Sequence, residues 1–375
     1  MFYNDFKDTR LSALGLGCMR LPLTGSDESG IDEARTQEMV DYALENGINY
    51  FDTAWGYHGH NSEIVIGKCL KKHPRDSFYL ATKFPGYDTT NMGKAEEIFE
   101  EQLKKCQVDY FDFYLFHNVC EKNIDLYLDP KYKVHEYLTE QKKNGRIKHL
   151  GFSCHGDMDV LKRFVDAYGD DLEFCQLQIN YIDWSFQQAK EKAGFLKERG
   201  IELWVMEPVR GGKLAKLSDE NSQKLKALRP DETDVDWAFR FIQTVPAPVV
   251  TLSGMSDMEQ LKQNIELFSE YRPLNETELE ALNGVAKSML GVVPCTACRY
   301  CTEYCPMELD IPMLLALYNE HKFTGGGFLA PMRLSVLDED KKPSACIGCR
   351  SCENVCPQQI KISEAFADFV GMLNK

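Results

Sequence analysis

Short apolar runs alternate with longer amphipathic stretches along roughly the first 290 residues of the chain. Continuous apolar runs of this kind are typical of strands that are buried on both faces, as in a parallel sheet covered by helices. The runs predicted as strands cover residues 14–19, 49–51, 78–81, 111–116, 147–152, 174–179, 202–206 and 249–252.

The intervals between these runs carry helical patterns. In residues 95–106, the apolar side chains Ile98, Phe99 and Leu103 recur at a spacing that places them on one helix face. The other predicted helices cover residues 37–46, 134–143 and 193–199, and a glycine follows closely after each of them. Strands that alternate with helices indicate repeated βαβ units.

Two architectures suit such a series, a closed (β/α)8 barrel and an open doubly wound sheet. The open sheet normally has a glycine-rich turn after its first strand, leading into a helix. Here Gly15-Leu16-Gly17 is followed by Pro22 and a polar stretch, with no third glycine. The pattern therefore favours an α/β fold of the TIM-barrel type over residues 1–288.

The chain has 375 residues, which leaves room for a second, smaller domain at residues 289–375. Its formal net charge of −15 argues against nucleic acid as a partner, because phosphate backbones require basic surfaces. The first ten residues carry charges of both signs and no apolar core, so no signal peptide is expected. No apolar stretch is long enough to cross a membrane.

The predicted second domain contains the motif C-x2-C-x2-C-x3-C-P twice. In bacterial proteins with this motif, three cysteines of one run and the fourth cysteine of the other bind the same iron–sulfur cluster. We therefore predict two [4Fe–4S] clusters. One is assigned to Cys295, Cys298, Cys301 and Cys356, and the other to Cys346, Cys349, Cys352 and Cys305.

Disulfides and zinc are the alternative interpretations of these cysteines. Disulfides fit poorly because nothing else indicates a secreted protein, and zinc sites often consist of two C-x2-C pairs. The region resembles bacterial two-cluster ferredoxins, with a longer spacer that contains an apolar helical stretch at 313–320 and a turn at 325–327. It is similar to the ferredoxin modules appended to larger redox enzymes, which implies a small, mainly helical domain.

Six further cysteines have no common spacing, and buried free thiols are expected for them. Together with the cluster motifs they indicate a reducing, cytoplasmic location. These cysteines are Cys18, Cys69, Cys106, Cys120, Cys154 and Cys175.

Four polar side chains stand where predicted barrel strands end. Asp52 follows the run 49–51, Tyr57 comes five residues later, and Lys83 and His117 follow the next two runs. Each alone has a plainer interpretation, such as a helix cap, a solvated lysine or a polar core group. Because the carboxyl ends of barrel strands face one site, their order along successive strands favours a shared catalytic role.

The chemistry of this set suits carbonyl reduction. A tyrosine has a pKa of about 10, and a neighbouring ammonium group such as that of Lys83 is expected to lower it. Asp52 can keep Lys83 charged, and His117 can orient a carbonyl group. Tyr57 then protonates the carbonyl oxygen while hydride reaches the carbon, or removes the proton of an alcohol in the reverse direction.

The segments 52–57, 81–83 and 115–117 resemble the catalytic tetrad of the aldo-keto reductases. Other similar segments, at 14–20, 61–67, 145–153, 178–181, 208–214 and 253–264, extend the resemblance over about residues 10–285. The resemblance implies that Asp52, Tyr57, Lys83 and His117 are the catalytic residues. It also implies a small carbonyl compound or alcohol as the substrate.

The same resemblance implies that the barrel binds NADP or NAD. Ser153 and Gln178 would hold the carboxamide of the nicotinamide, and residues 254–264 would meet the adenosine half beside a helix N-terminus. The expected cofactor-binding residues are Met19, Asp52, Ser153, Gln178, Met206, Val209, Gly211, Gly254, Ser256, Gln260 and Asn264.

Three departures from the family pattern concern this cofactor. Cys154 replaces a frequent asparagine, and Met206 replaces a tyrosine that often stacks on the nicotinamide. Asp257 and Glu259 stand where a 2′-phosphate would need a basic partner, for which Arg210 is a candidate. The choice between NAD and NADP therefore stays open.

Three functions are compatible with the sequence. The first is a carbonyl reductase or alcohol dehydrogenase whose clusters relay electrons, with a redox partner protein as a second partner. The second is an electron-transfer protein whose barrel serves as a docking or flavin-binding module, because a flavin commonly mediates between one-electron and two-electron carriers. The third is a reductase whose clusters are structural or sense the redox state.

Overall fold

A computed structural model describes residues 1–245, 247–290 and 293–374. The chain divides into two compact units, Met1–Asn283 and Gly284–Lys375. The limits of 288 and 289 expected from the sequence fall inside the second unit, within a helix that begins in the first.

Eight parallel strands of the first unit form a closed barrel, with the last strand, β10, hydrogen-bonded to both β9 and β3. The predicted (β/α)8 fold is thus confirmed. The barrel strands are β3 (Leu14–Gly17), β4 (Tyr50–Asp52), β5 (Tyr79–Phe84), β6 (Phe111–Val119), β7 (Ile147–Cys154), β8 (Phe174–Gln178), β9 (Glu202–Met206) and β10 (Val250–Ser253).

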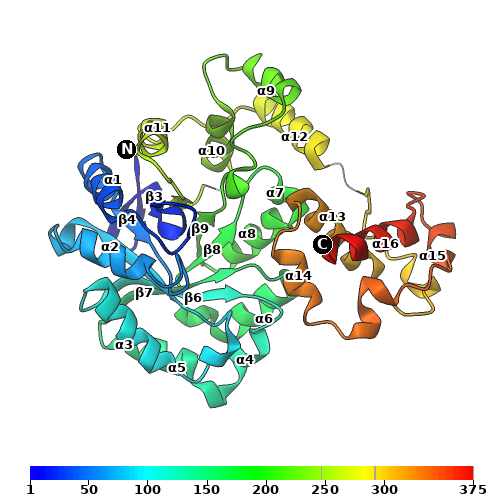
Figure 1. Cartoon of the computed structure of the whole chain (residues 1–375), viewed down its shortest axis with the longest axis horizontal. Coiled ribbons are helices and arrows are strands. Elements are labelled where there is room, and N and C mark those ends of the chain that lie inside the picture. Colours follow the sequence, from blue (N-terminus) through cyan, green and yellow to red (C-terminus); the bar gives the residue numbers. More distant parts are fainter. Residues whose placement is uncertain (246, 291–292, 375) are drawn as a thin grey trace. The chain divides into compact units, whose positions relative to one another are not determined.

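The helices of the first unit lie outside this ring of strands (Figure 1). Many begin at a side-chain cap that satisfies free backbone N–H groups. Asp32, for example, accepts a hydrogen bond from the Arg35 N–H at the start of α1, and Asp257 accepts one from the Gln260 N–H at the start of α11. The helices are α1 (Glu33–Glu45), α2 (Ser62–Leu70), α3 (Ala95–Cys106), α4 (Ile124–Leu128), α5 (Val134–Lys143), α6 (Met158–Tyr168), α7 (Asp183–Phe186), α8 (Ala189–Glu198), α9 (Asp219–Lys226), α10 (Asp234–Thr244) and α11 (Met258–Leu267).

A hairpin of two antiparallel strands, β1 (Tyr3–Phe6) and β2 (Thr9–Ser12), precedes the barrel. Its Phe6 and Leu11 are buried in one apolar cluster with barrel residues such as Phe113 and Trp204. The pattern of apolar runs along the chain did not predict this hairpin. Single apolar residues in a short polar segment are too sparse to reveal this packing from sequence.

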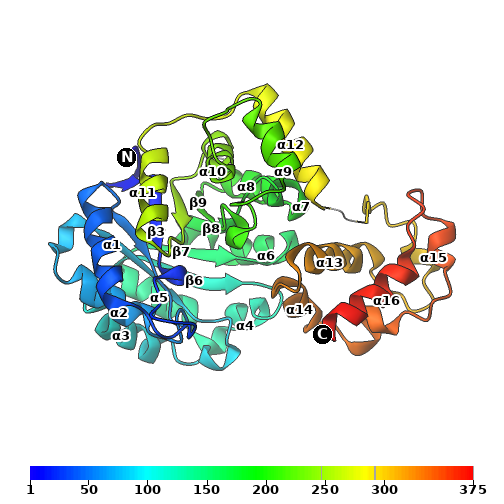
Figure 2. The same ribbon diagram turned by 45° about the horizontal axis from the view of Figure 1, so that its top comes forward.

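The second unit is helical, as expected from its apolar stretch at 313–320. Helices α13 and α16 pack against each other, and this arrangement is visible in both views (Figures 1 and 2). Their contact buries Leu314, Tyr318, Phe366 and Phe369. The helices are α12 (Glu276–Leu290), which begins in the first unit, and α13 (Ile311–Thr324), α14 (Leu329–Leu334), α15 (Ser351–Asn354) and α16 (Ile362–Leu373).

Gly325 ends α13 in the left-handed conformation, with φ of 68°, so the predicted glycine turn forms a helix C-cap. None of the helices in the described ranges is both long enough and apolar enough to pass through a membrane.

Candidate active site and cysteine cavities

The structure brings the four predicted catalytic side chains to the carboxyl ends of neighbouring strands. Asp52 is the last residue of β4, Lys83 lies near the end of β5, and His117 lies near the end of β6. Tyr57 stands in the loop between β4 and α2. Strand pairing of β4 with β5 and of β5 with β6 fixes the spacing of these positions.

Lys83 and Asp52 form a buried ion pair, with the Lys83 Nζ 2.6 Å from Asp52 Oδ1. The ammonium group also donates to the Thr53 carbonyl at 2.7 Å and to the Tyr57 hydroxyl at 3.5 Å. Burial lowers the pKa of Lys83, but Asp52 and Tyr57 together more than offset this, and the net pKa is raised. Lys83 is therefore a charged group in contact with the Tyr57 phenol.

Burial raises the pKa of Tyr57 above its usual value of 10, and the Lys83 ammonium only partly opposes this rise. The sequence correctly places a lysine beside the tyrosine, but the expected net lowering of the Tyr57 pKa is wrong. The loss of hydration of the phenolate outweighs one neighbouring charge. Tyr57 is consequently a protonated phenol at neutral pH.

His117 lies beside Tyr57, with ring centroids 6.0 Å apart in an edge-to-face arrangement. Burial, together with the Lys83 charge, lowers the pKa of His117 well below 6.5. The imidazole is therefore neutral at pH 7. Its Nδ1 is buried without a hydrogen-bond partner in the described structure.

Two residues that contact this group were not predicted. Gln176, on β8 across the barrel, donates from Nε2 to Asp52 Oδ2 at 3.1 Å, so both carboxylate oxygens of Asp52 are engaged. The Tyr87 ring packs edge-to-face on His117 at 5.1 Å. A glutamine inside the apolar run of β8 is the one signal that could have marked Gln176.

The residues expected to hold the carboxamide end neighbouring strands. Ser153, near the end of β7, is buried, and its Oγ accepts a hydrogen bond from the Asn118 N–H at 2.8 Å. Gln178 ends β8 and donates from Nε2 to Asp183 at 2.8 Å. Met206 ends β9, directly paired with Gln178 in the sheet. These positions are compatible with the predicted role, which stays a prediction.

The residues expected at the phosphates and the adenosine lie in the loops after β3, β9 and β10. Met19 is 54% exposed, and Val209 and Gly211 belong to a turn in which Gly211 has a φ of 62°. The Ser256 N–H and the Gln260 side chain bond to each other at the start of α11. Gly254 is exposed in the same loop.

Asn264 and Arg210 are both turned into the protein. The Asn264 amide is buried and donates to Ser253 Oγ at 3.1 Å, which ties α11 to β10. The Arg210 Nε lies 2.9 Å from Asp183 Oδ2 in an ion pair that is almost fully buried. Arg210 is thereby removed as a candidate partner of a 2′-phosphate.

The eight motif cysteines of the second unit line two separate cavities. The first cysteine cavity is lined by Cys295, Cys298, Cys301 and Cys356. The second cysteine cavity is lined by Cys305, Cys346, Cys349 and Cys352. Each cavity thus takes three cysteines from one run and the fourth from the other, and these are the two ligand sets expected from the sequence.

The two cavities are small and similar in size, about 10 Å³ each. Within the described ranges, no three His, Cys, Asp or Glu side chains are arranged to hold a single metal ion. Four thiols around a cavity suit a multinuclear cluster better than one tetrahedral zinc ion. The two loops also share a backbone conformation, because Arg299 and Arg350, each directly after the second cysteine of its run, both have φ above 60°.

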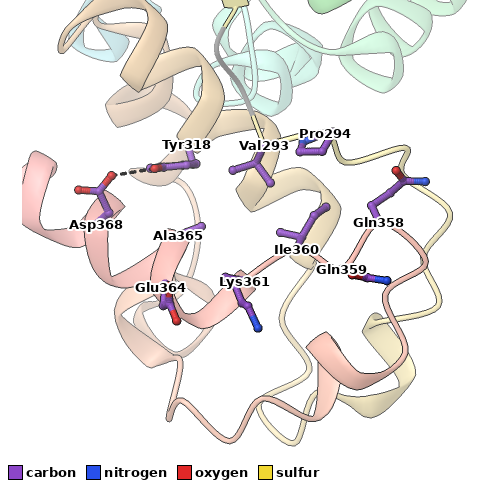
Figure 3. Close-up of a pocket in the computed structure, with 10 residues that line it drawn as sticks. All are labelled: Val293, Pro294, Tyr318, Gln358, Gln359, Ile360, Lys361, Glu364, Ala365 and Asp368. Atoms are coloured by element: carbon purple, nitrogen blue, oxygen red, sulfur yellow. Dashed lines mark hydrogen bonds between the residues drawn. The ribbon is translucent and has the colours of Figure 1, made fainter.

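A groove of about 400 Å³ adjoins the first cysteine cavity (Figure 3). Tyr318 of α13 and Asp368 of α16 lie on one side of it and are hydrogen-bonded at 2.7 Å. Gln358 and Ile360 line both the groove and the cavity. The groove and the first cysteine cavity therefore share part of their lining.

Residues 13–287 match the aldo/keto reductase family, a span that includes all eight barrel strands. The chain belongs to this family. Residues 294–362 match the 4Fe-4S dicluster domain and include all eight cysteines of the two cavities. The protein is thus an oxidoreductase of the aldo/keto reductase type that carries an iron–sulfur domain.

Its relatives are of moderate similarity. The uncharacterised oxidoreductase YqkF of Bacillus subtilis is 26% identical over 311 residues, which are 75% of this chain and 94% of that protein. The NADH-specific methylglyoxal reductase of Escherichia coli is 28% identical over 227 residues, 55% of this chain and 66% of that one. The aldo-keto reductase AKR11C1 of Bacillus halodurans, solved in its holo form, is 27% identical and has a TM-score of 0.62, covering 77% of this chain and 97% of its own.

Proposed function

We propose that the barrel reduces an aldehyde or ketone with a nicotinamide dinucleotide, NADH or NADPH, and oxidises the alcohol in the reverse direction. Tyr57 is the general acid and base of this reaction. The observation that carries the proposal is the buried chain from Asp52 through Lys83 to the Tyr57 hydroxyl, beside a neutral His117. Membership of the family supports the same chemistry.

Each side chain has a defined part in this proposal. When bound, the dinucleotide supplies hydride to the carbonyl carbon. His117 donates a hydrogen bond to the carbonyl oxygen and orients it. Tyr57 gives its phenolic proton to that oxygen, and the Lys83 ammonium stabilises the phenolate that remains. Asp52, held by Gln176, keeps Lys83 charged and in place.

The proposed cofactor fits the polar groups at the carboxyl ends of β7 and β8. Ser153 and Gln178 offer a hydroxyl group and an amide group on neighbouring strands. The loop from β10 to α11 offers backbone N–H groups at a helix N-terminus, which suits a phosphate. A relative of known cofactor, the Escherichia coli reductase, is NADH-specific by name.

We further propose that each cysteine cavity holds one [4Fe–4S] cluster and that the clusters relay single electrons to a redox partner protein. The second cysteines of the two runs, Cys298 and Cys349, are exposed. The groove (Figure 3) shares Gln358 and Ile360 with the lining of the first cysteine cavity and so offers a second surface beside it. Electron exchange between proteins requires such closeness to the surface.

The raised pKa of Tyr57 gives the proposal a pH test. Because the phenol stays protonated through neutral pH, kcat/KM for carbonyl reduction should be level between about pH 6 and 9. Alcohol oxidation needs the phenolate, so its kcat/KM should rise about tenfold per pH unit over the same range. Initial rates in both directions, under anaerobic conditions, measure the two profiles.

A different profile would contradict the role of Tyr57. If reduction declined through an apparent pKa of about 6.5, a protonated histidine would be the acid. A panel of small aldehydes and ketones is first assayed with NADH and with NADPH. The combination of substrate and dinucleotide with the highest kcat/KM is then used for the pH profiles.

A further inference from the structure

One carboxylate oxygen in the barrel is the acceptor of three hydrogen bonds. Asp183 Oδ2 accepts from Gln178 Nε2 at 2.8 Å, from Asn180 Nδ2 at 2.6 Å and from Arg210 Nε at 2.9 Å. Asp183 is fully buried at the start of α7, and its donors come from the end of β8, the loop after β8 and the turn after β9. The expected cofactor residue Gln178 is thus held by a buried ion pair that the sequence did not reveal.

This contact fixes which way the Gln178 amide faces. Arg210 is charged at every physiological pH, so its direct partner Asp183 is an ionised carboxylate that can only accept hydrogen bonds. Gln178 must then present its NH2 group to Asp183, because its carbonyl oxygen would be repelled there. The amide oxygen of Gln178 is the group left to meet a ligand, and it is an acceptor.

The Ser153 hydroxyl has the opposite polarity. Its oxygen accepts the Asn118 N–H at 2.8 Å, which leaves the hydroxyl proton to be donated. Ser153 pairs with Gln176 across β7 and β8, and Gln178 lies two residues further along the same face of β8. A donor and an acceptor therefore stand close together at the mouth of the barrel.

We propose that Asp183 is a positioning residue that sets this polarity and so makes the site selective for a primary carboxamide. The carboxamide oxygen takes the Ser153 proton, and the carboxamide NH2 donates to the Gln178 oxygen. A carboxylate or a methyl ketone at the same position of the pyridine ring offers no N–H to Gln178. The inference rests on the proposed nicotinamide-dependent function. It adds a reason why the cofactor site should prefer a carboxamide on the pyridine ring.

Binding of three oxidised dinucleotides to the full-length protein tests the proposal. The probes are NAD+, its nicotinic acid analogue and its 3-acetylpyridine analogue, or the corresponding NADP+ series if that cofactor binds better. The wild-type protein should bind the carboxamide form about tenfold more tightly than either analogue, since one hydrogen bond is lost in each. Titration calorimetry gives the dissociation constants.

Asp183→Asn frees the Gln178 amide to turn, so the preference for the carboxamide should shrink to about twofold or less. Asp183→Asn/Arg210→Met removes both buried charges and serves if the single variant fails to fold. Asp166→Asn, in an exposed pair with Arg199, is the charge control and should keep the wild-type preference. Circular dichroism checks the fold of each variant.

The outcomes separate this inference from the function on which it rests. A wild-type protein that binds the three forms equally, or a folded Asp183 variant that keeps the wild-type preference, overturns the role of Asp183 and leaves the reductase proposal standing. A wild-type protein that binds none of the dinucleotides overturns both.

Discussion

Tyr57→Phe should lower kcat for carbonyl reduction by about 10²- to 10⁴-fold, the range that proton transfer by a positioned side chain contributes. The variant removes only the phenolic oxygen, so the Asp52–Lys83 pair and the packing of the ring against His117 remain. Dissociation constants for the dinucleotide should stay within about twofold. Steady-state rates and a binding titration on the same preparation measure both effects.

Tyr271→Phe is the matched control for this variant, because Tyr271 is a 56% exposed tyrosine of the barrel unit and has no part in the proposed site. It should keep wild-type turnover, and both variants should keep the wild-type iron content. Turnover retained by Tyr57→Phe would show that another group protonates the carbonyl oxygen. His117 would then be the next residue to replace.

Replacing the four cysteines of the first cysteine cavity with alanine should reduce bound iron from about eight to about four atoms per chain. The second cysteine cavity keeps all four thiols in this variant, so its cluster should retain the spectrum of an intact [4Fe–4S] centre. Iron and sulfide analysis after anaerobic reconstitution, with paramagnetic resonance of the reduced protein, measures the result.

Replacing the four cysteines of the first run instead should damage both clusters. This variant removes three thiols from the first cysteine cavity and Cys305 from the second, so bound iron should fall below four atoms per chain. Cys69→Ala, at a buried cysteine of the barrel unit, controls for loss of a thiol. If the run variant kept one intact cluster and the cavity variant lost both, each run would bind its own cluster.

Much of the fold follows from the spacing of apolar runs. All eight predicted strands occur, but β5, β6 and β7 extend beyond their apolar runs to Phe84, Val119 and Cys154. The added residues include Lys83, His117 and Ser153, whose polar side chains face the proposed site. The predicted strands are too short at these ends because the prediction followed apolar residues, and the last residues of these strands include polar ones.

The meeting of Asp52, Tyr57 and Lys83, and the grouping of the cysteines around two cavities, could be predicted because each depends on order and spacing along the chain. Gln176 and Asp52 are 124 residues apart and meet only across the closed barrel, so no local pattern reveals their hydrogen bond. Arg210 and Asp183 form a buried pair for a similar reason. The direction in which the Tyr57 pKa shifts from its usual value also depends on burial, which the sequence does not give.

The most direct test of the proposed reaction is the transfer of deuterium from the dinucleotide to the product. Full-length protein with intact clusters is incubated without oxygen with NADH or NADPH deuterated at C4 of the nicotinamide, and with a small carbonyl compound such as methylglyoxal. If the barrel performs direct hydride transfer, mass spectrometry and proton NMR should find deuterium on the new carbinol carbon. Solvent hydrogen at that carbon, or bleaching of the clusters without alcohol formation, would contradict direct hydride transfer and favour electron flow through the iron–sulfur domain.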